Sequence, residues 1–418
     1  MIASAWRLGA TLAAPGLRRI LRRRVARGKE IAERLPEREG REATPRPAGE
    51  VLWLHAASVG EAISVLPVLT CLARRAPALS VVFTTGTVTS ARMLAQRLPA
   101  LGLTRVQHRF VPLDVPAWAA RFVGHWRPDA AAFVESELWP NLLAACQARG
   151  VRLMLVNGRM SARSFRNWRR VKEMARALIG AFDRVHAQSA EYAERLALLG
   201  ARGMVAPGNL KWAAPKLGVD AGELERLRPM LAGRSVWLAA STHPGEETMA
   251  GEVHRALLPA FPDLLTIVVP RHPERGAAVA AALAAGRRSC ADPPAAAGIW
   301  VVDTMGELGL LYRLVPVVFI GGSLVPHGGQ NPLEAARFGC ALAAGPHTAN
   351  FDEMVARLLA VGGLAAVPDT AALAGFVGAM LRDPVARTAM GEAGQSVADD
   401  EQALPERVAD VLLELLAV

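Results

Sequence analysis

Short apolar runs alternate with longer amphipathic stretches from residue 51 onward. Near-continuous apolar runs are typical of strands buried on both faces of a parallel sheet. In the first half of the chain such runs predict strands over residues 51–54, 79–85, 130–134, 151–156 and 184–187. Helices are predicted between them, over residues 61–75, 88–98, 138–149 and 189–199. This alternation predicts a doubly wound α/β domain.

The alternation stops at residues 207–233, a segment rich in proline and glycine that predicts a linker. It then resumes, with predicted strands over residues 235–240, 264–269, 299–302, 315–320 and 340–343. Predicted helices cover residues 245–258, 273–285, 305–313, 332–338 and 350–360. The chain is therefore predicted to form two doubly wound α/β domains that face a cleft, with the helices after about residue 370 packing across either domain. Ligands are expected at the carboxyl ends of the strands.

The N-terminal 21 residues form an apolar stretch that Arg7 and Pro15 interrupt and an arginine cluster ends. A membrane-spanning helix needs roughly 20 mostly apolar residues, and a signal peptide has its positive charge before its apolar part. An interfacial anchor fits better, with arginines toward anionic headgroups. Its expected lipid-facing residues are Ile2, Trp6, Leu17, Leu21 and Val25. The alternative is a solvated basic tail; residues 35–50 are predicted to form a linker or loop.

Composition and charge narrow the class of protein. Hydrophobic residues make up 52% of the 418 residues and charged residues 21%, which excludes a disordered chain. The formal net charge is +10, but residues 1–29 carry eight basic side chains and no acidic one, which leaves +2 for the rest. Because a nucleic-acid binder spreads basic residues over a folded face, no nucleic-acid partner is predicted. Four scattered cysteines without a CxxC motif favour a reduced, cytoplasmic setting.

A strand-to-helix junction at residues 52–62, LWLHAASVGEA, contains the first candidate residue. Gly60 permits a close backbone turn, and the amides at the helix start favour an anion. Glu61 has no neighbouring Lys or Arg in the sequence. It is therefore either a helix-start carboxylate that interacts with the helix dipole or a general base at the mouth of the cleft.

Charged residues also follow two later strands of the first half. In FVESELWPNLL, residues 133–143, Glu135 and Glu137 are two positions apart, so an extended segment would place both on one side. One of them either holds a cation or orients an acceptor, or both serve turns and caps. Lys211 of GNLKW either faces the cleft or is a solvated linker residue. An arginine cluster follows the strand before NGRMSARS and either binds phosphate or carboxylate groups or forms a solvated face: Arg159, Arg163, Arg166, Arg169 and Arg170.

The loops of the second half suit a nucleotide. STHPGEE, residues 241–247, is a hydroxyl-rich loop that enters a helix and suits phosphate. VPRHPER, residues 269–275, places Arg271 and His272 at a strand end, positioned for a phosphodiester. In FIGGSLVPHGGQNPLEAARFG, residues 319–339, a glycine-rich loop precedes a helix that begins at Pro332 and carries Glu334 in its first turn. A glutamate in that position holds ribose hydroxyls in many sugar-nucleotide enzymes.

Several catalytic motifs are absent from the sequence. There is no GxxxxGK[ST] loop, no HExxH and no GxSxG. There is also no DxD motif to hold a divalent metal on a nucleotide diphosphate. Neither a metal site nor a cofactor is therefore predicted.

Nine segments occur in a fixed order: HAASVGE, ESELWPNLL, NGRMSARS, GNLKW, ASTHPGEE, VPRHPER, DTMGELGLLY, GGSLVPHGGQNPLEAA and GPHTANF. Together they closely resemble the 3-deoxy-D-manno-octulosonic acid (Kdo) transferases of Gram-negative bacteria over roughly residues 35–360. One position departs from the family, because Gln330 stands where many members have histidine. Glutamine forms hydrogen bonds but does not titrate near neutral pH, so no proton transfer is assigned to it.

The resemblance implies a GT-B glycosyltransferase fold with two Rossmann-like domains. Residues 1–34 would associate with the membrane, residues 35–207 would bind the acceptor, and residues 208–418 would bind the donor. The implied reaction is an inverting transfer of Kdo from CMP-Kdo to the lipid A precursor lipid IV-A, which starts the lipopolysaccharide core. Its implied location is the cytoplasmic face of the inner membrane.

The resemblance also implies roles for individual residues. Glu61 would be the base that deprotonates the acceptor hydroxyl, and Glu135 and Lys211 would stabilise the transition state. The departing CMP gains phosphate charge, which Arg271, Lys211 and helix-start amides would offset without a metal. The implied CMP site consists of Pro270, Arg271, Met305, Gly306, Glu307, Asn331, Pro332, Leu333 and Glu334.

Two alternatives stay open on the sequence alone. One is another GT-B enzyme that uses a different nucleotide sugar on a membrane lipid. The other is a catalytically inactive protein that binds a membrane surface. The presence of Glu61, Glu135 and Lys211 together disfavours the inactive protein.

Overall fold

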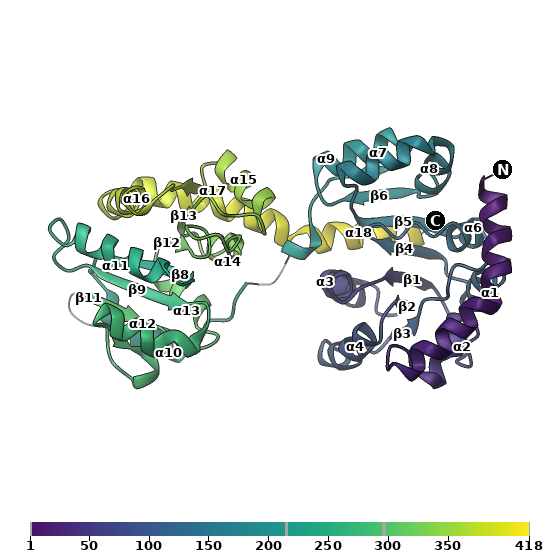
Figure 1. Ribbon diagram of the computed structural model, residues 1–418, viewed down its shortest axis with the longest axis horizontal. Helices are drawn as coiled ribbons and strands as arrows, with labels where there is room; N and C mark the ends of the chain where they lie inside the picture. The colour runs from purple at the N-terminus through teal and green to yellow at the C-terminus, as the bar shows by residue number, and fades with distance from the viewer. Residues whose placement is uncertain (1, 214–215, 295–297, 418) are drawn as a thin grey trace. The chain divides into compact units, whose positions relative to one another are not determined.

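The computed structural model describes residues 2–213, 216–294 and 298–417, with only the backbone described for residues 2–5. Contacts divide the chain into two units, coloured along the sequence in Figure 1. The first unit contains the residues up to 214 together with residues 401–418. The second unit contains residues 215–400.

The first unit is built on a parallel sheet with strand order β3-β2-β1-β4-β5-β6-β7. Helices α3, α4 and α18 cover one face of this sheet, and helices α5, α6, α8 and α9 cover the other. The order reverses between β1 and β4, which makes the carboxyl ends of these two strands the switch point where ligands bind in such sheets. The strands are β1 (Val51–Ala56), β2 (Ser80–Thr85), β3 (Val106–Phe110), β4 (Ala130–Val134), β5 (Arg152–Gly158), β6 (Arg184–Ala187) and β7 (Met204–Val205). The helices that follow the strands are α3 (Val59–Arg75), α4 (Val88–Ala100), α5 (Pro116–Trp126), α6 (Pro140–Gln147), α7 (Ala162–Arg170), α8 (Lys172–Ile179), α9 (Ala190–Leu198) and the short η2 (Leu210–Trp212).

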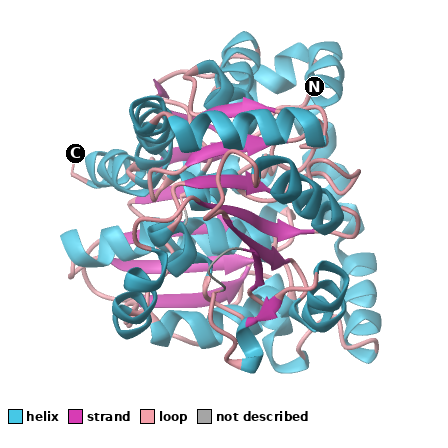
Figure 2. Cartoon of the chain, turned by 90° about the vertical axis from the view of Figure 1, so that its left-hand side faces the viewer, coloured by secondary structure: helices cyan, strands magenta, loops and turns pink. Residues whose placement is uncertain are grey.

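The second unit repeats this plan, with strand order β10-β11-β9-β8-β12-β13-β14. Figure 2 is viewed from the side of this unit and shows strands flanked by helices. Its switch point lies between β8 and β12. The strands are β8 (Val236–Thr242), β9 (Leu265–Pro270), β10 (Gly286–Arg287), β11 (Gly298–Val301), β12 (Val317–Ile320), β13 (Ala341–Ala344) and β14 (Leu364–Ala366). The helices are α10 (Ala221–Leu231), α11 (Glu246–Leu257), η3 (Pro273–Arg275), α12 (Gly276–Leu283), η4 (Arg288–Cys290), α13 (Leu308–Leu314), α14 (Pro332–Ala336), α15 (Asp352–Ala360), α16 (Thr370–Arg382) and α17 (Pro384–Gln402).

The prediction of two doubly wound parallel sheets is confirmed. The predicted linker over residues 207–233 is wrong in part, because α10 forms within it despite its glycine and proline content. Asp220 caps this helix by accepting from the Glu223 amide, and Pro229 falls in its last turn. Because proline has no amide hydrogen, the helix lacks the one hydrogen bond that residue 229 would otherwise donate.

The C-terminal helix α18 (Leu404–Leu416) packs in the first unit, against α3, β4 and β5. Its apolar face, including Leu412 and Leu415, is buried in the same core cluster as Leu66 and Leu69 of α3. The period of this face is that of an amphipathic helix. The C-terminal helix thus completes the core on the face of the sheet that α3 and α4 cover.

The N-terminal helix α1 (Ile2–Ala26) packs on α5 and is not a solvated tail. Trp6 Nε1 donates to Asp114 Oδ2 at 3.0 Å, and Arg18 forms a two-point ion pair with Glu39 at 2.9 Å. Leu21 is only 4% exposed, so the expected lipid-facing stripe is wrong at this residue. The side chain of Ile2 lies outside the described residues.

Among the expected residues, Trp6 is 46% exposed, and Leu8, Leu12 and Ile20, which were not predicted, are 52–72% exposed. The helix turns by 100° per residue, so these three lie away from the side on which Leu21 is buried. Across the described residues, none of the helices has the length and apolar character needed to cross a membrane.

Two short helices follow α1. The first, η1 (Ala32–Arg34), precedes the segment predicted as a linker or loop, and the second, α2 (Leu35–Arg38), lies inside it. Arg38 is buried and pairs with Glu30 at 3.1 Å. It also donates to the carbonyls of Gly86 and Val111, at 2.7 and 3.2 Å. A guanidinium with several acceptors fixes this segment to the carboxyl end of β2.

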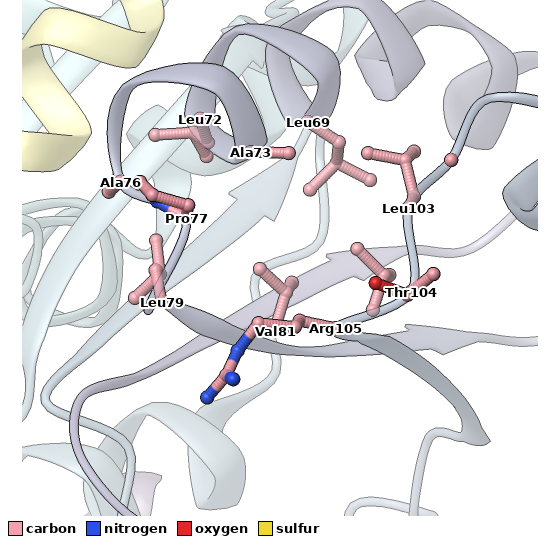
Figure 3. A pocket seen from close by; sticks show the side chains of 12 residues that line it. Leu69, Leu72, Ala73, Ala76, Pro77, Leu79, Val81, Leu103, Thr104 and Arg105 are labelled. Atoms are coloured by element: carbon pink, nitrogen blue, oxygen red, sulfur yellow. The ribbon is translucent and has the colours of Figure 1, made fainter.

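An aliphatic hollow of about 230 Å³ lies beside the C-terminal half of α3 (Figure 3). Its lining includes Leu72, Leu79 and Leu103, with Arg105 at one side. Leu79 and Arg105 precede strands, so the hollow opens at the amino edge of the sheet. It is therefore at the edge opposite the switch point.

Candidate active site

Glu61 lies in the first turn of α3, directly after β1 at the switch point of the first unit. Ser58 caps the helix, and its Oγ donates to Glu61 Oε1 at 2.8 Å. The Ala57 amide donates to Glu61 Oε2 at 2.8 Å. These contacts resemble a capping box and hold the carboxylate in one orientation.

The environment of Glu61 raises its pKa above the ordinary value for glutamate. Burial is the largest cause, and the negative charges of Glu135 and Glu137 add to it. The hydrogen bonds from Ser58 and Ala57 oppose the shift without cancelling it. A carboxylate with a raised pKa is a stronger base, which is what proton abstraction requires.

Glu135 follows β4 on the other side of the switch point and pairs with Lys211. Lys211 Nζ lies 2.5 Å from Glu135 Oε1. The carboxylate is largely buried, whereas the lysine side chain keeps 41% of its exposure. Lys211 is thus a half-exposed cation held by a buried anion, on the short helix η2, which contacts α3.

The extended backbone predicted for the segment of Glu135 and Glu137 is wrong. Glu135 has a φ of +61°, so the backbone is left-handed there instead of extended. Glu137 turns to other partners: Trp139 Nε1 donates to it at 2.5 Å, and His55 Nε2 lies 3.4 Å away. Burial alone would raise the pKa of Glu137, but its contacts with His55 and Trp139 lower it overall.

His55, at the end of β1, was not among the predicted site residues. It is 1% exposed and its Nδ1 lies 3.0 Å from Thr84 Oγ1. It therefore connects β2 to Glu137 through the interior of the unit. A histidine inside a near-continuous apolar strand was the available sign of this role.

The arginine cluster lies on and beside α7. Phe165 and Trp168 of this helix pack on the core, which turns the charged residues outward. Ser161 caps α7 by accepting from the Ser164 amide. No ion pair is formed within the described residues by any of the cluster's members: Arg159, Arg163, Arg166, Arg169 and Arg170.

In the second unit, Pro270 ends β9 and Arg271 follows it with an exposed side chain. Burial raises the pKa of Glu334, which nearby Arg337 and Arg271 partly offset. Arg271 and Glu334 are therefore close enough to interact. Asn331 caps α14 by accepting from the Leu333 amide at 3.1 Å, and Pro332 is the first residue of the helix.

Met305 and Gly306 form an exposed turn before α13, with Met305 77% exposed and Gly306 at a φ of +83°. Glu307 is held by Arg288, whose Nη2 lies 2.6 Å from Glu307 Oε1. Burial would raise the pKa of Glu307, but Arg288 and Thr304 lower it overall. Among the described contacts, none joins Glu307 directly to Arg271 or Glu334.

The loop predicted to suit phosphate, STHPGEE, is instead filled by two carboxylates of the chain. Glu246 is 1% exposed and accepts four backbone N–H groups. These come from His243 at 2.9 Å, Gly322 at 2.7 Å, Ser323 at 3.0 Å and Leu324 at 3.0 Å. Consecutive amides of this kind form an anion-binding nest. Glu246 thereby joins the loops after β8 and β12 across the switch point.

Gln330 lies in the loop after β12, and its Nε2 donates to His243 Nε2 at 3.0 Å. Burial and the neighbouring His327 and His272 lower the pKa of His243. The His243 ring also stacks on His327 with 4.0 Å between ring centroids. Because His243 Nε2 accepts from Gln330, the His243 ring is neutral and carries its proton on Nδ1.

The described residues contain no group of three or more His, Cys, Asp or Glu side chains arranged to hold a metal ion. Cations near the candidate residues include Lys211 in the first unit and Arg271, Arg288 and Arg337 in the second.

Comparison with known proteins identifies relatives over most of the chain. A family model described as 3-deoxy-D-manno-octulosonic-acid transferase (kdotransferase) matches residues 31–214. The 3-deoxy-D-manno-octulosonic acid transferase of Haemophilus influenzae is 36% identical over 393 residues, or 91% of each chain. A probable mitochondrial 3-deoxy-D-manno-octulosonic acid transferase of Arabidopsis thaliana is 38% identical over 350 residues, which cover 80% of this chain and 77% of that protein.

Among solved structures, UDP-GlcNAc 2-epimerase from Neisseria meningitidis matches with a TM-score of 0.55 at 12% identity. The match covers 88% of this chain and 100% of that one. At this identity the likeness concerns the fold alone. With the two doubly wound units, it confirms the predicted GT-B fold.

Proposed function

Because the chain belongs to the 3-deoxy-D-manno-octulosonic acid transferase family, we propose that it transfers Kdo from CMP-Kdo to lipid IV-A, a lipid A precursor. The observation that carries the proposal is the cluster at the switch point of the first unit. Glu61 has a raised pKa there, and Glu135, whose charge acts on Glu61, holds Lys211. Such a cluster can remove one proton and stabilise one developing negative charge.

Glu61 is the general base of the proposed reaction. It takes the proton of an acceptor sugar hydroxyl as that oxygen forms a bond to the anomeric carbon of Kdo. The bond between this carbon and the CMP phosphate oxygen breaks, and its electron pair leaves with CMP. A single displacement inverts the anomeric centre and needs only this one base.

Lys211 and Glu135 stabilise the charge that develops in this step. The phosphate of the departing CMP gains negative charge, which an ammonium offsets. The Lys211 side chain is partly exposed, and its ion pair with Glu135 fixes its position. A fixed cation needs no rearrangement at the moment of reaction, which is the source of its effect.

The donor nucleotide is proposed to bind the second unit, with Arg271 on the CMP phosphate and Glu334 on the ribose hydroxyls. Pro270 and Pro332 begin the two segments that carry these side chains. The exposed turn at Met305 and Gly306 supplies a further contact with the nucleotide, and the ion pair between Glu307 and Arg288 supports that turn. Asn331 and Leu333 complete the proposed CMP site through the helix start.

The acceptor is a phosphorylated membrane lipid, and we propose that the first unit meets it at the cytoplasmic face of the inner membrane. The exposed Leu8, Leu12 and Ile20 of α1 would enter the lipid interface. Neighbouring arginines would contact anionic headgroups. The arginine cluster of α7 would bind phosphates of the acceptor itself.

The test is a CMP-release assay with CMP-Kdo and lipid IV-A. Wild-type protein is compared with Glu61→Gln and with Glu194→Gln, an exposed glutamate on α9. We expect acceptor-dependent release that Glu61→Gln loses and Glu194→Gln keeps, and the product mass counts the sugars added. If well-folded wild-type protein releases no CMP, the donor is a different nucleotide sugar or the chain is inactive.

The α7 cluster is tested with Arg163→Ala and Arg166→Ala together. These changes should raise the KM for lipid IV-A while the affinity for CMP stays unchanged. An equal loss of acceptor use and CMP affinity would contradict the assigned role.

A further inference from the structure

The position of Lys211 depends on a segment that has little regular structure of its own. The lysine lies on the three-residue helix η2, whose N-cap Asn209 accepts from the Lys211 amide at 3.1 Å. The Asn209 amide in turn donates to Glu401 Oε2 at 3.3 Å. A short 3₁₀ turn is weak on its own, so the contacts around it decide where the ammonium lies.

Asn157 provides the contact next to Lys211. Asn157 lies near the carboxyl end of β5, and its backbone is left-handed, with a φ of +56°. Asparagine adopts this conformation more readily than most residues. Its side chain is fully buried, and its Oδ1 accepts from the Leu210 amide at 3.0 Å.

The backbone of Asn157 is fixed from behind by His186 on the neighbouring strand β6. The Asn157 amide donates to His186 Nδ1 at 3.1 Å. This requires the neutral imidazole, with its proton on Nε2. Burial and the charge of Arg407 lower the pKa of His186 to about 4, so the ring is neutral at physiological pH.

These contacts close a ring around the proposed catalytic pair. The Glu135 amide donates to the Val156 carbonyl at 2.9 Å, immediately before Asn157. Asn157 then binds Leu210, immediately before Lys211, and Lys211 returns to Glu135 through its ion pair. The ring lies within the first unit and joins the loop after β4, the carboxyl end of β5 and the η2 turn that follows β7.

We propose that Asn157, supported by His186, is a positioning residue that sets the Lys211 ammonium on Glu135 for the transfer reaction. The NGRMS segment then contributes more than Arg159, because its Asn157 connects the end of β5 to η2. The role of the ring in catalysis rests on the proposed function, whereas its effect on the Lys211 segment does not.

The ring also affects the base. The negative charges of Glu135 and Glu137 raise the pKa of Glu61, and Lys211 compensates that of Glu135. Without the Asn157 side chain, Lys211 is less often at Glu135, so more uncompensated charge acts on Glu61. The acid limb of the rate profile should therefore move to higher pH, since Glu61 must be ionised to act.

The test compares Asn157→Ala with Asn141→Ala. Asn141 is also buried and hydrogen-bonded, to Asp114, but does not contact the ring. We expect kcat to fall about tenfold in Asn157→Ala, the equivalent of one hydrogen bond. The KM for CMP-Kdo should stay unchanged and the acid limb should move upward. Asn141→Ala should keep both kcat and the profile, even at a similar loss of thermal stability.

Hydrogen exchange at the amides of Leu210 and Lys211 provides a readout that does not need turnover. Asn157→Ala should speed exchange at both amides, and His186→Ala should do so as well. If exchange, kcat and the pH profile of Asn157→Ala match those of Asn141→Ala, the positioning role is wrong. If wild-type protein shows no Kdo transfer but exchange responds as expected, the proposed function fails while the ring is supported.

Discussion

Replacing Glu246 with glutamine should destabilise the second unit strongly, although the two side chains have nearly the same shape. The carboxylate accepts four backbone amides at 2.7–3.0 Å and is 1% exposed. The amide of glutamine keeps one acceptor oxygen and turns an NH₂ group toward the other donors. Two hydrogen bonds to a charged group are lost, each worth about 1.5–3 kcal/mol. The expected cost is therefore about 3–6 kcal/mol.

The matched control is Glu252→Gln, which removes the same charge from an exposed position on the same helix. Exposed substitutions of this kind usually change stability by less than about 0.5 kcal/mol. Thermal unfolding of both full-length variants gives the difference in stability. Hydrogen exchange over residues 322–324 reports the nest itself, because these amides are the ones that lose their acceptor.

Chemical rescue separates the loss of the anion from a general loss of packing. Glu246→Ala leaves a space with backbone donors on its wall, so added formate should restore part of the stability, and chloride at equal ionic strength should restore less. The reasoning is refuted if Glu246→Gln unfolds at the same temperature as Glu252→Gln with unchanged exchange at residues 322–324. Restoration by chloride equal to that by formate would likewise count against a carboxylate site.

Three further outcomes follow from the same structure. The rate of CMP release should fall with decreasing pH through a pKa above 4.5, the ordinary value for glutamate, because protonated Glu61 cannot act as a base. Leu412→Ala should lower the urea midpoint of the full-length protein by the equivalent of about 2–5 kcal/mol, since the side chain is 1% exposed in the core. Burial lowers the pKa of His108 to about 3, so the unfolded chain binds a proton below pH 6.5 that the folded protein does not. Stability should therefore fall on acidification, and His108→Gln should reduce that slope by about 1.4 kcal/mol per pH unit, as measured by urea unfolding at several pH values.

Strands buried on both faces were the most predictable part of the fold. Residues 130–134 form a strand as predicted, since an uninterrupted apolar run has no other place than the interior of a sheet. The strand over Val106–Phe110 was missed because it lies at the sheet edge and reads VQHRF, with polar residues that an edge tolerates. Helix α5 was missed as well, although Pro116 at its start is a sequence signal for the beginning of a helix.

The candidate site was predictable where a residue's place follows from a strand end. Glu61 and Glu135 both follow strands of the first unit, and the strand order brings them to one switch point. The ion pair between Lys211 and Glu135 was not predictable from the separate segments, since it depends on the turn of η2. Glu246 was missed because three of its four partners lie more than 70 positions away, in a loop whose glycines suggested an external ligand.

The α18 helix has a consequence for how the chain folds during synthesis. Residues 215–400 separate the first 214 residues of the first unit from the helix that completes its core. A ribosome adds about 5–20 residues per second, so that apolar face stays open for about 10–40 s while the second unit is made. The second unit is continuous in the chain and can form as soon as it emerges. The first part to be translated is therefore the last to be finished, and it is the part that a chaperone would have to protect.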